Sequence, residues 1–252
     1  MHWSLKNYLK RHSKDPAVRR RAMNKFFERR LRPHGLHLYK GHLNWALSGE
    51  LNALHATWGD VPGVPADRCA FLHAVGRIAR ERALDGDTAE CGVRYGKSTF
   101  FLLSALASPD KPHHIFDSFE GLSAIGARDR PAGETKRWQA GDIAVGEDVT
   151  RGNLAAFSNC VFHKGWIPER FPDVADRRFA LVHIDVDLYQ PTRDALEFFY
   201  PRMVPGGMIL CDDYGFASCP GATQAFDDFF ADKPEFILPI PTGQCWVEKR
   251  GG

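Results

Sequence analysis

The pattern of apolar residues changes about a third of the way along the chain. Before Asp85, helical patterns over residues 3–31, 44–57 and 68–84 predict three helices. After Asp85, short apolar runs alternate with longer amphipathic stretches, which predicts βαβ units and a mainly parallel sheet. The expected strands cover residues 88–93, 113–117, 161–163, 179–186 and 207–211, and the expected helices cover residues 97–107, 147–157, 192–202 and 221–230.

Two further apolar runs, at residues 236–239 and 244–248, predict a closing antiparallel hairpin. We therefore expect an α/β protein with a doubly wound, Rossmann-like sheet. Its domain organisation would be an N-terminal helical extension over residues 1–84, followed by the α/β domain over residues 85–252.

The composition is that of an ordinary globular protein, with 44% hydrophobic and 25% charged residues. The six cysteines are scattered without any Cys-x-x-Cys pair, which argues against a disulfide framework or a zinc site. The chain shows neither the apolar core of a signal peptide nor a run of roughly 18 apolar residues. We expect a cytoplasmic protein without a membrane partner.

Positive charge is concentrated at the N-terminus, because residues 1–33 hold eleven Lys or Arg and only two acids. Such an arm could contact nucleic acid or an anionic membrane. A solvated helix that packs on the acidic remainder of the chain, or on a second subunit, is the favoured interpretation, since no aromatic-studded RNA-binding motif accompanies the charge. We expect no nucleic-acid partner.

The first expected strand runs into a glycine-containing turn that holds Glu90, Gly92 and Val93 and leads through Gly96 to Ser98. Glycine is needed where the backbone turns tightly or lies against a ligand. The spacing is neither that of a dinucleotide site nor that of a Walker loop, although phosphate binding and a purely structural turn stay open. A carboxylate at this position suits a cationic ligand, such as the amino group or sulfonium of S-adenosylmethionine.

The second expected strand ends in Asp117, about 25 residues beyond Gly92. An acid there is well placed to accept hydrogen bonds from both hydroxyls of a ribose. A helix or turn cap is the alternative. Together, Glu90 and Asp117 predict adenosine binding without a phosphate requirement.

Four acids follow the last two parallel strands: Asp185 and Asp187 after one, Asp212 and Asp213 after the next. Carboxylates at one sheet edge repel each other unless a cation neutralises them, and Mg²⁺ accepts all-oxygen ligation. Asp185 is expected to be a ligand and proton acceptor, and Asp187 a ligand or a partner of one. Alternatively, Asp212 and Asp213 cap a helix and Asp185 pairs with an arginine.

Two strand histidines, His163 and His183, are given no role, because such histidines are usually satisfied within the core. The acids instead define the expected reaction, in which two substrate oxygens chelate the cation and one is methylated.

Five motifs in order resemble the macrocin O-methyltransferase (TylF-like) family, over roughly residues 85–248. They are Glu90-Cys91-Gly92-Val93, the run from Phe116 to Leu122, the run from Lys164 to Pro168, the run from His183 to Thr192, and the run from Pro205 to Tyr214. The resemblance implies a class I methyltransferase that uses S-adenosylmethionine and Mg²⁺ to methylate sugar hydroxyls of natural products.

The resemblance also implies roles for particular residues. Glu90 and Gly92 would line the methionine part of the cofactor, and Asp117 and Ser118 the ribose. Gly165 and Trp166 would lie near the adenine, and Asp142 would reach the adenosine. Val93, Ser98 and Asp185 would also contact the cofactor. Asp185, Asp212 and Asp213 would hold the metal, and Asp185 would be the base. Residues 119–147 would form a mobile lid. The N-terminal helices would contribute to acceptor specificity and to a homodimer.

Two other classes of function stay open at this point. A nicotinamide-dependent oxidoreductase could use the same sheet, but the dinucleotide glycine motif is missing. A non-catalytic binding module with a methyltransferase fold is also possible, but every acid of the expected site is present. A small hydroxylated acceptor therefore remains the expected partner.

Overall fold

The computed structural model describes residues 48–130 and 138–251, together with isolated positions before residue 48. The chain divides into two compact units, residues 1–52 and 53–252, and the site lies in the second. The expected helix over residues 3–31 lies largely outside the described residues. Within the described part, every helix is too short or too polar to span a bilayer.

The described residues form a seven-stranded sheet in the order β3-β2-β1-β4-β5-β7-β6. The first five strands are parallel, and β7 runs antiparallel to both β5 and β6. The strand order therefore reverses between β1 and β4, where open α/β sheets place their ligands. The strands are β1 (Asp87–Cys91), β2 (His113–Asp117), β3 (Cys160–Lys164), β4 (Phe179–Ile184), β5 (Met203–Cys211), β6 (Leu238–Pro239) and β7 (Cys245–Glu248).

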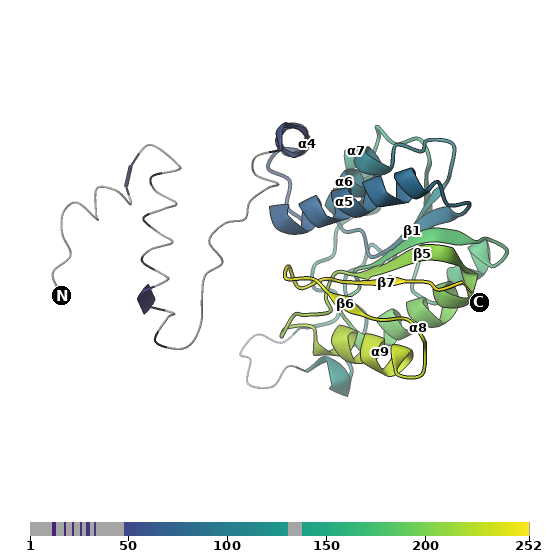
Figure 1. The fold of residues 1–252 in the computed structure, drawn as a ribbon. Coiled ribbons are helices and arrows are strands. Elements are labelled where there is room, and N and C mark those ends of the chain that lie inside the picture. The colour runs from purple at the N-terminus through teal and green to yellow at the C-terminus, as the bar shows by residue number, and fades with distance from the viewer. Residues whose placement is uncertain are drawn as a thin grey trace. The chain divides into compact units, whose positions relative to one another are not determined.

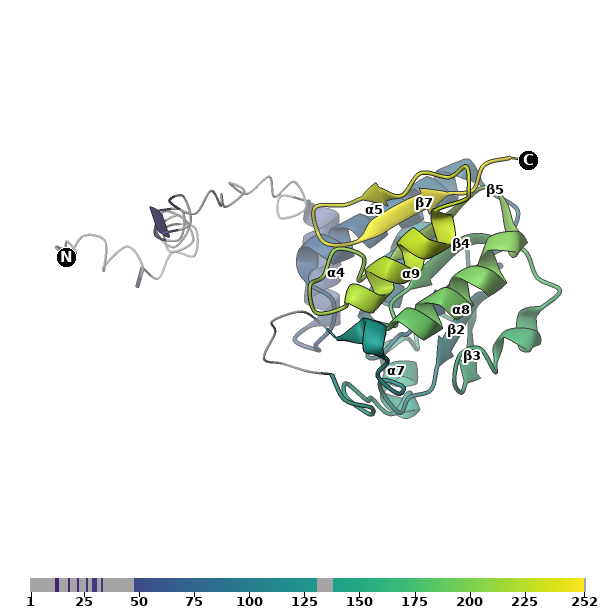
Figure 2. The same ribbon diagram turned by 90° about the horizontal axis from the view of Figure 1, so that it is seen from below.

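Helices cover both faces of the sheet (Figure 1). On one face lie α5 (Ala66–Arg82) and α6 (Lys97–Leu106), and on the other α8 (Tyr189–Phe199) and α9 (Pro220–Phe230), which run side by side in Figure 2. Residues 48–130 and 138–251 also contain helices α4 (Gly49–Trp58) and α7 (Glu147–Asn153), with 3₁₀ turns at Ala127–Asp129, Phe171–Val174 and Tyr200–Arg202.

Successive side chains along a strand pack into two different hydrophobic cores, one on each face of the sheet, as β4 illustrates. Leu181 packs with α5 and α6, whereas Val182 and Ile184 pack with α8 and α9. Since successive side chains of a strand point to opposite faces, His183 lies on the α5 and α6 side. This buried frame fixes the strand ends that carry the polar residues.

The structure confirms the predicted doubly wound fold and closing hairpin, with shifted element ends. The helix expected over residues 192–202 begins three residues earlier, at Tyr189, and gives way after Phe199 to the 3₁₀ turn that contains Pro201. Proline lacks the N–H that would continue the helix. Helix α7 ends at Asn153 rather than at residue 157. The predicted domain boundary after residue 84 stays a prediction.

Candidate active site

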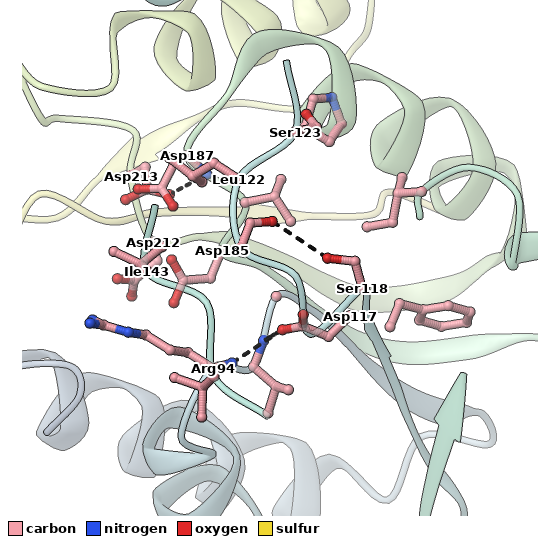
Figure 3. Close-up of a pocket in the computed structure, with 18 of the residues that line it drawn as sticks. Arg94, Asp117, Ser118, Leu122, Ser123, Ile143, Asp185, Asp187, Asp212 and Asp213 are labelled. Atoms are coloured by element: carbon pink, nitrogen blue, oxygen red, sulfur yellow. Dashed lines mark hydrogen bonds between the residues drawn. The ribbon is translucent and has the colours of Figure 1, made fainter. Parts of the chain in front are cut away.

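A cavity of about 530 Å³ opens where the strand order reverses, at the carboxyl ends of β1, β2, β4 and β5. Its volume is in the range of small-molecule sites. Figure 3 shows the carboxylates of Asp185 and Asp212 next to one another on one side of it, with Asp117 and Ser118 on the other. The predicted site residues that line it are Gly92, Val93, Ser98, Asp117, Ser118, Gly165, Trp166, Asp185, Asp187, Asp212 and Asp213.

The turn after β1 closes tightly on the end of β4. Gly92 has φ 81°, and a Cβ on it would collide with the backbone carbonyl oxygen of Asp185. The amide of Gly92 donates to Phe116 (2.9 Å) and that of Asp185 donates to Cys91 (2.8 Å). These contacts tie three strand ends together, so only glycine fits at position 92.

Asp117 clamps the same turn from β2. Its Oδ2 accepts hydrogen bonds from the amides of Val93 (2.8 Å) and Arg94 (3.2 Å), and its Oδ1 accepts one from Phe119 (2.7 Å). The turn-capping role that the sequence left open is therefore present. Because a carboxylate offers about four acceptor positions, Asp117 still has capacity for a ribose hydroxyl.

Glu90 lies beneath the cavity rather than in its lining, and its side chain is 0% exposed. Its oxygens instead accept hydrogen bonds from the Thr99 hydroxyl and from Nδ1 of His183 (2.9 Å). Glu90 belongs to β1 rather than to the turn, and its side chain points into the sheet layer. The arrangement does not support its predicted contact with the cofactor.

Asp142 is the second predicted residue outside the cavity lining. Its Oδ2 accepts a hydrogen bond from the amide of Gln139 (3.0 Å), so the carboxylate caps its own turn. The neighbouring Ile143 and Val145 line the cavity instead. The predicted lid over residues 119–147 lies partly outside the described residues.

The three predicted metal ligands, Asp185, Asp212 and Asp213, do not fall into one group of neighbouring donor atoms. Among the described residues, possible donor atoms within 4.8 Å of one another form two groups: His183 with Asp185 and Asp212, and Asp187 with Asp213 and Cys219. The predicted ligands thus fall into both groups. His183 lies two residues before Asp185 in the fourth family motif, but it was expected to be a core histidine without a role. Cys219 is a lone residue that only the folded chain brings to the acids.

Burial and neighbouring carboxylates raise the pKa of Asp185 well above its ordinary value, with Asp212 the foremost of these neighbours. Burial and the charge of Asp187 raise the pKa of Asp213 in the same way. Acids whose ionisation is opposed in this manner gain from a nearby cation.

Arg68, at the start of α5, supplies one such cation. Its guanidinium forms an ion pair with Oδ2 of Asp212 and lies 3.9 Å from the centre of the Phe216 ring. Sequence reasoning left an arginine partner open for Asp185 and did not foresee one for Asp212. Arg68 is 144 residues away from Asp212 in the chain, and nothing in its local sequence marks it out.

A family model described as Macrocin-O-methyltransferase (TylF) matches residues 64–234. The chain belongs to the macrocin O-methyltransferase family. This match begins just before Arg68 and spans every strand end that borders the cavity.

Two curated proteins are similar to this chain in sequence. The 8-demethyl-8-(2,3-dimethoxy-alpha-L-rhamnosyl)-tetracenomycin-C 4'-O-methyltransferase of Streptomyces olivaceus is 33% identical over 170 residues, 64% of this chain and 65% of that protein. The mycinamicin III 3''-O-methyltransferase of Micromonospora griseorubida is 27% identical over 69% of this chain and 72% of that protein. The chain therefore matches slightly less than two thirds of the length of the first relative.

A solved structure shares the fold. The O-methyltransferase NovP superposes with a TM-score of 0.61 at 24% identity, over 75% of this chain and 81% of that chain. At this identity the similarity shows the architecture alone.

Proposed function

We propose that this chain transfers the methyl group of S-adenosylmethionine to a hydroxyl of a sugar, or of another small molecule with neighbouring hydroxyls, with the help of Mg²⁺ and within natural-product biosynthesis. The observation that carries the proposal is one cavity with a glycine turn and Asp117 on one side and four carboxylates on the other. Family membership and the named activities of the relatives support it.

The residues that line the cavity are of the kinds that the cofactor requires. Gly92, Val93 and Ser98 line the cavity at the turn after β1 and the start of α6. The Asp117 carboxylate and the Ser118 hydroxyl lie at the end of β2, where a ribose is expected. Trp166 and Ile143 offer apolar surface for the adenine region.

The donor set also fits a divalent cation. Asp185, Asp212 and Asp213 would hold it, because their oxygens are hard ligands. Burial and neighbouring carboxylates raise the pKa values of Asp185 and Asp213, and a cation would offset that effect. When bound, the cation supplies Lewis acidity that lowers the pKa of the substrate hydroxyl. The backbone amide of Asp187 donates a hydrogen bond to Oδ2 of Asp213 (3.1 Å) and so helps to position the Asp213 carboxylate.

The residues of the chain then position the acceptor and take up its proton. The hydroxyl oxygen forms a bond to the methyl carbon, the carbon–sulfur bond breaks, and its electron pair stays on sulfur as S-adenosylhomocysteine. The hydroxyl proton passes to Asp185, whose carboxylate lines the cavity at the end of β4. Alignment of the two reactants supplies most of the rate.

The proposal keeps several finer expectations. Residues 1–84 would contribute to acceptor choice and to a homodimer, residues 85–252 would form the methyltransferase domain, and the protein would act in the cytoplasm without a nucleic-acid partner. Arg68 supports a role for the first segment, because this residue of α5 lines the cavity.

The decisive variant is Asp212→Ala. We expect methyl transfer to fall at least about 100-fold, because several kcal/mol of electrostatic stabilisation is lost, while the affinity for S-adenosylhomocysteine stays within a few-fold. Labelled methyl donor, Mg²⁺ and a panel of hydroxylated acceptors, scored by mass shift, measure the first quantity, and calorimetry measures the second. Asp142→Ala is the matched control, since that acid lies outside the cavity lining.

Other results would contradict the proposal at separate points. Undiminished transfer in EDTA, or equal turnover of Asp212→Ala, would remove the metal from the mechanism. Binding of NAD in place of S-adenosylhomocysteine would indicate an oxidoreductase, and binding of neither ligand would indicate a non-catalytic module.

A further inference from the structure

A chain of fully buried polar groups connects β1 with the acids beside the cavity. Oε1 of Glu90 accepts a hydrogen bond from Nδ1 of His183 (2.9 Å), and both side chains are 0% exposed. The other oxygen of Glu90 accepts the Thr99 hydroxyl. In a neutral imidazole whose Nδ1 carries the proton, Nε2 presents a lone pair.

That second nitrogen has no hydrogen-bond partner. Nε2 of His183 is buried and lies 3.5 Å from Oδ1 of Asp212, within ion-pair distance but outside hydrogen-bond geometry. Donor atoms of His183, Asp185 and Asp212 lie within 4.8 Å of one another. A lone pair that faces carboxylates without a proton or a metal ion between them is unfavourable, and an unpaired buried polar atom is costly.

Asp212 is held in place to face this nitrogen. Its Oδ2 forms an ion pair with Arg68. Its Oδ1 accepts a hydrogen bond from Nε2 of Gln244 (2.7 Å), the residue directly before β7. Asp212 is 0% exposed and Gln244 1% exposed. The carboxylate therefore has a fixed orientation, with one acceptor position of Oδ1 still available beside His183.

We propose that Nε2 of His183 is a further ligand of the divalent-cation site, beside Asp185 and Asp212, and that Glu90 orients it. A carboxylate that accepts the other ring N–H of a metal-binding histidine is a recurrent arrangement, because it fixes the tautomer and raises the basicity of the ligand. The inference rests on the proposed metal requirement. It also gives the buried Glu90 a function that does not need contact with the cofactor.

The donor set predicts the kind of ion. Imidazole nitrogen suits first-row transition ions better than Mg²⁺, whereas carboxylate oxygen suits both Mg²⁺ and Mn²⁺. A site with one nitrogen and two or more carboxylates is therefore expected to bind Mn²⁺ more tightly than Mg²⁺, and Mg²⁺ at higher concentration is expected to displace Mn²⁺.

A proton is the competing occupant of Nε2. Burial opposes the charged imidazolium, but Asp212 and Glu90 together raise the pKa of His183 well above its ordinary value. If His183 stays an imidazolium, it pairs with Asp212 as a cation and takes no part in metal binding. The two possibilities differ in whether nitrogen contacts the metal.

Pulsed electron paramagnetic resonance of the full chain with Mn²⁺ alone distinguishes them directly. We expect ¹⁴N modulation from a directly bound histidine, which changes to a ¹⁵N pattern when the histidines carry ¹⁵N. This isotope measurement needs no substitution, so it does not depend on the folding of a variant. Mn²⁺ that binds without histidine coupling overturns the inference and leaves a carboxylate site.

Three variants refine the test, each with its thermal unfolding recorded. His183→Gln should lose the ¹⁴N modulation and at least about tenfold in Mn²⁺ affinity, and Glu90→Gln should lose about 10–100-fold in affinity as an orienting partner does. His163→Gln is the matched control: its nitrogens lie beside His114 (3.0 Å) and Asp173 (3.1 Å) rather than beside Glu90, and it belongs to neither group of donors. It should keep both the coupling and the affinity.

The remaining outcomes bear on this inference and on the proposed function separately. A folded His183→Gln protein with unchanged modulation overturns the histidine ligand alone. Absence of any Mn²⁺ binding overturns the ligand and the metal requirement, whereas the methyl-transfer assay with labelled donor tests the reaction itself.

Discussion

At the scale of single residues, Gly92 illustrates how the site depends on a close approach of backbones. The φ of 81° and the contact with the Asp185 carbonyl oxygen both exclude a side chain. Gly152, in α7, differs on both counts: a Cβ there has no neighbour within 4 Å and its φ is not positive. A side chain is therefore excluded at Gly92 and tolerated at Gly152.

Gly92→Ala is expected to lower the free energy of unfolding by roughly 2 kcal/mol or more, because left-handed strain adds to the collision with β4. Affinity for S-adenosylhomocysteine should fall at least tenfold, since Gly92 lines the cavity. Urea unfolding and calorimetry measure the two effects. Gly152→Ala should instead be neutral or stabilising by up to about 1 kcal/mol, and equal behaviour of the two variants would show that the approach at Gly92 is not required.

At the scale of secondary-structure elements, β1, β2 and β3 are joined beneath the cavity by a second polar chain. Nδ1 of His114 lies 3.0 Å from Nε2 of His163, and Nε2 of His114 lies 3.2 Å from Asp87. The remaining nitrogen of His163 lies 3.1 Å from Asp173, and the His163 ring stacks on Phe116. His163 was expected to be a satisfied core histidine, and both of its nitrogens do have partners.

This histidine pair makes stability depend on pH. Burial is the main reason that the pKa of His114 is lowered from 6.5, with Asp87 acting against it. The unfolded chain therefore binds the proton first, so the contribution of His114 is present above about pH 6.5 and is lost as the pH falls. If both His114 and His163 were protonated, an N–H group of each imidazole would point at the other.

We expect the free energy of unfolding to decrease between pH 7 and pH 5.5, and to decrease less in His114→Gln. Urea titrations at the two pH values measure the difference. The comparison is made between pH values within each variant, which cancels the general cost of losing the imidazole. An equal or steeper decrease in His114→Gln would contradict the assignment to this pair.

At the scale of the whole molecule, the domain keeps four acids at one edge of its sheet, balanced only in part by Arg68. The raised pKa values of Asp185 and Asp213 mean that their ionisation destabilises the fold as the pH rises through those values. A bound cation would reverse this effect. The proposed metal site therefore predicts that the stability of the domain depends on cation binding.

Saturating Mg²⁺ or Mn²⁺ should raise the melting temperature over that in EDTA. At a concentration 100 times the dissociation constant, the gain is about 2.7 kcal/mol, or roughly 5–10 °C for a domain of this size. Differential scanning calorimetry at matched ionic strength measures it. Asp212→Ala should lose most of the shift and Asp142→Ala should keep it; an equal shift in both variants would place the ion elsewhere.

The sequence by itself determined the doubly wound fold, the order of its elements and the edge at which the site lies. Alternating apolar runs are local signals, and the carboxyl ends of parallel strands must share an edge, so Asp117, Asp185 and Asp212 could be placed on one rim without coordinates. The family motifs are likewise short stretches that can be read directly from the sequence. The ends of helices were less certain, because a residue such as Pro201 changes the helix type only in its context.

Only the tertiary structure decided which atoms face one another. Glu90 turned from the cavity to His183, Asp142 capped its own turn, and Arg68 reached Asp212 across 144 residues. The physical reason is that a strand's pleat and a helix's rotation set side-chain direction, and packing fixes both. The sequence states the chemistry available at the sheet edge, whereas burial and distance select the groups that act together.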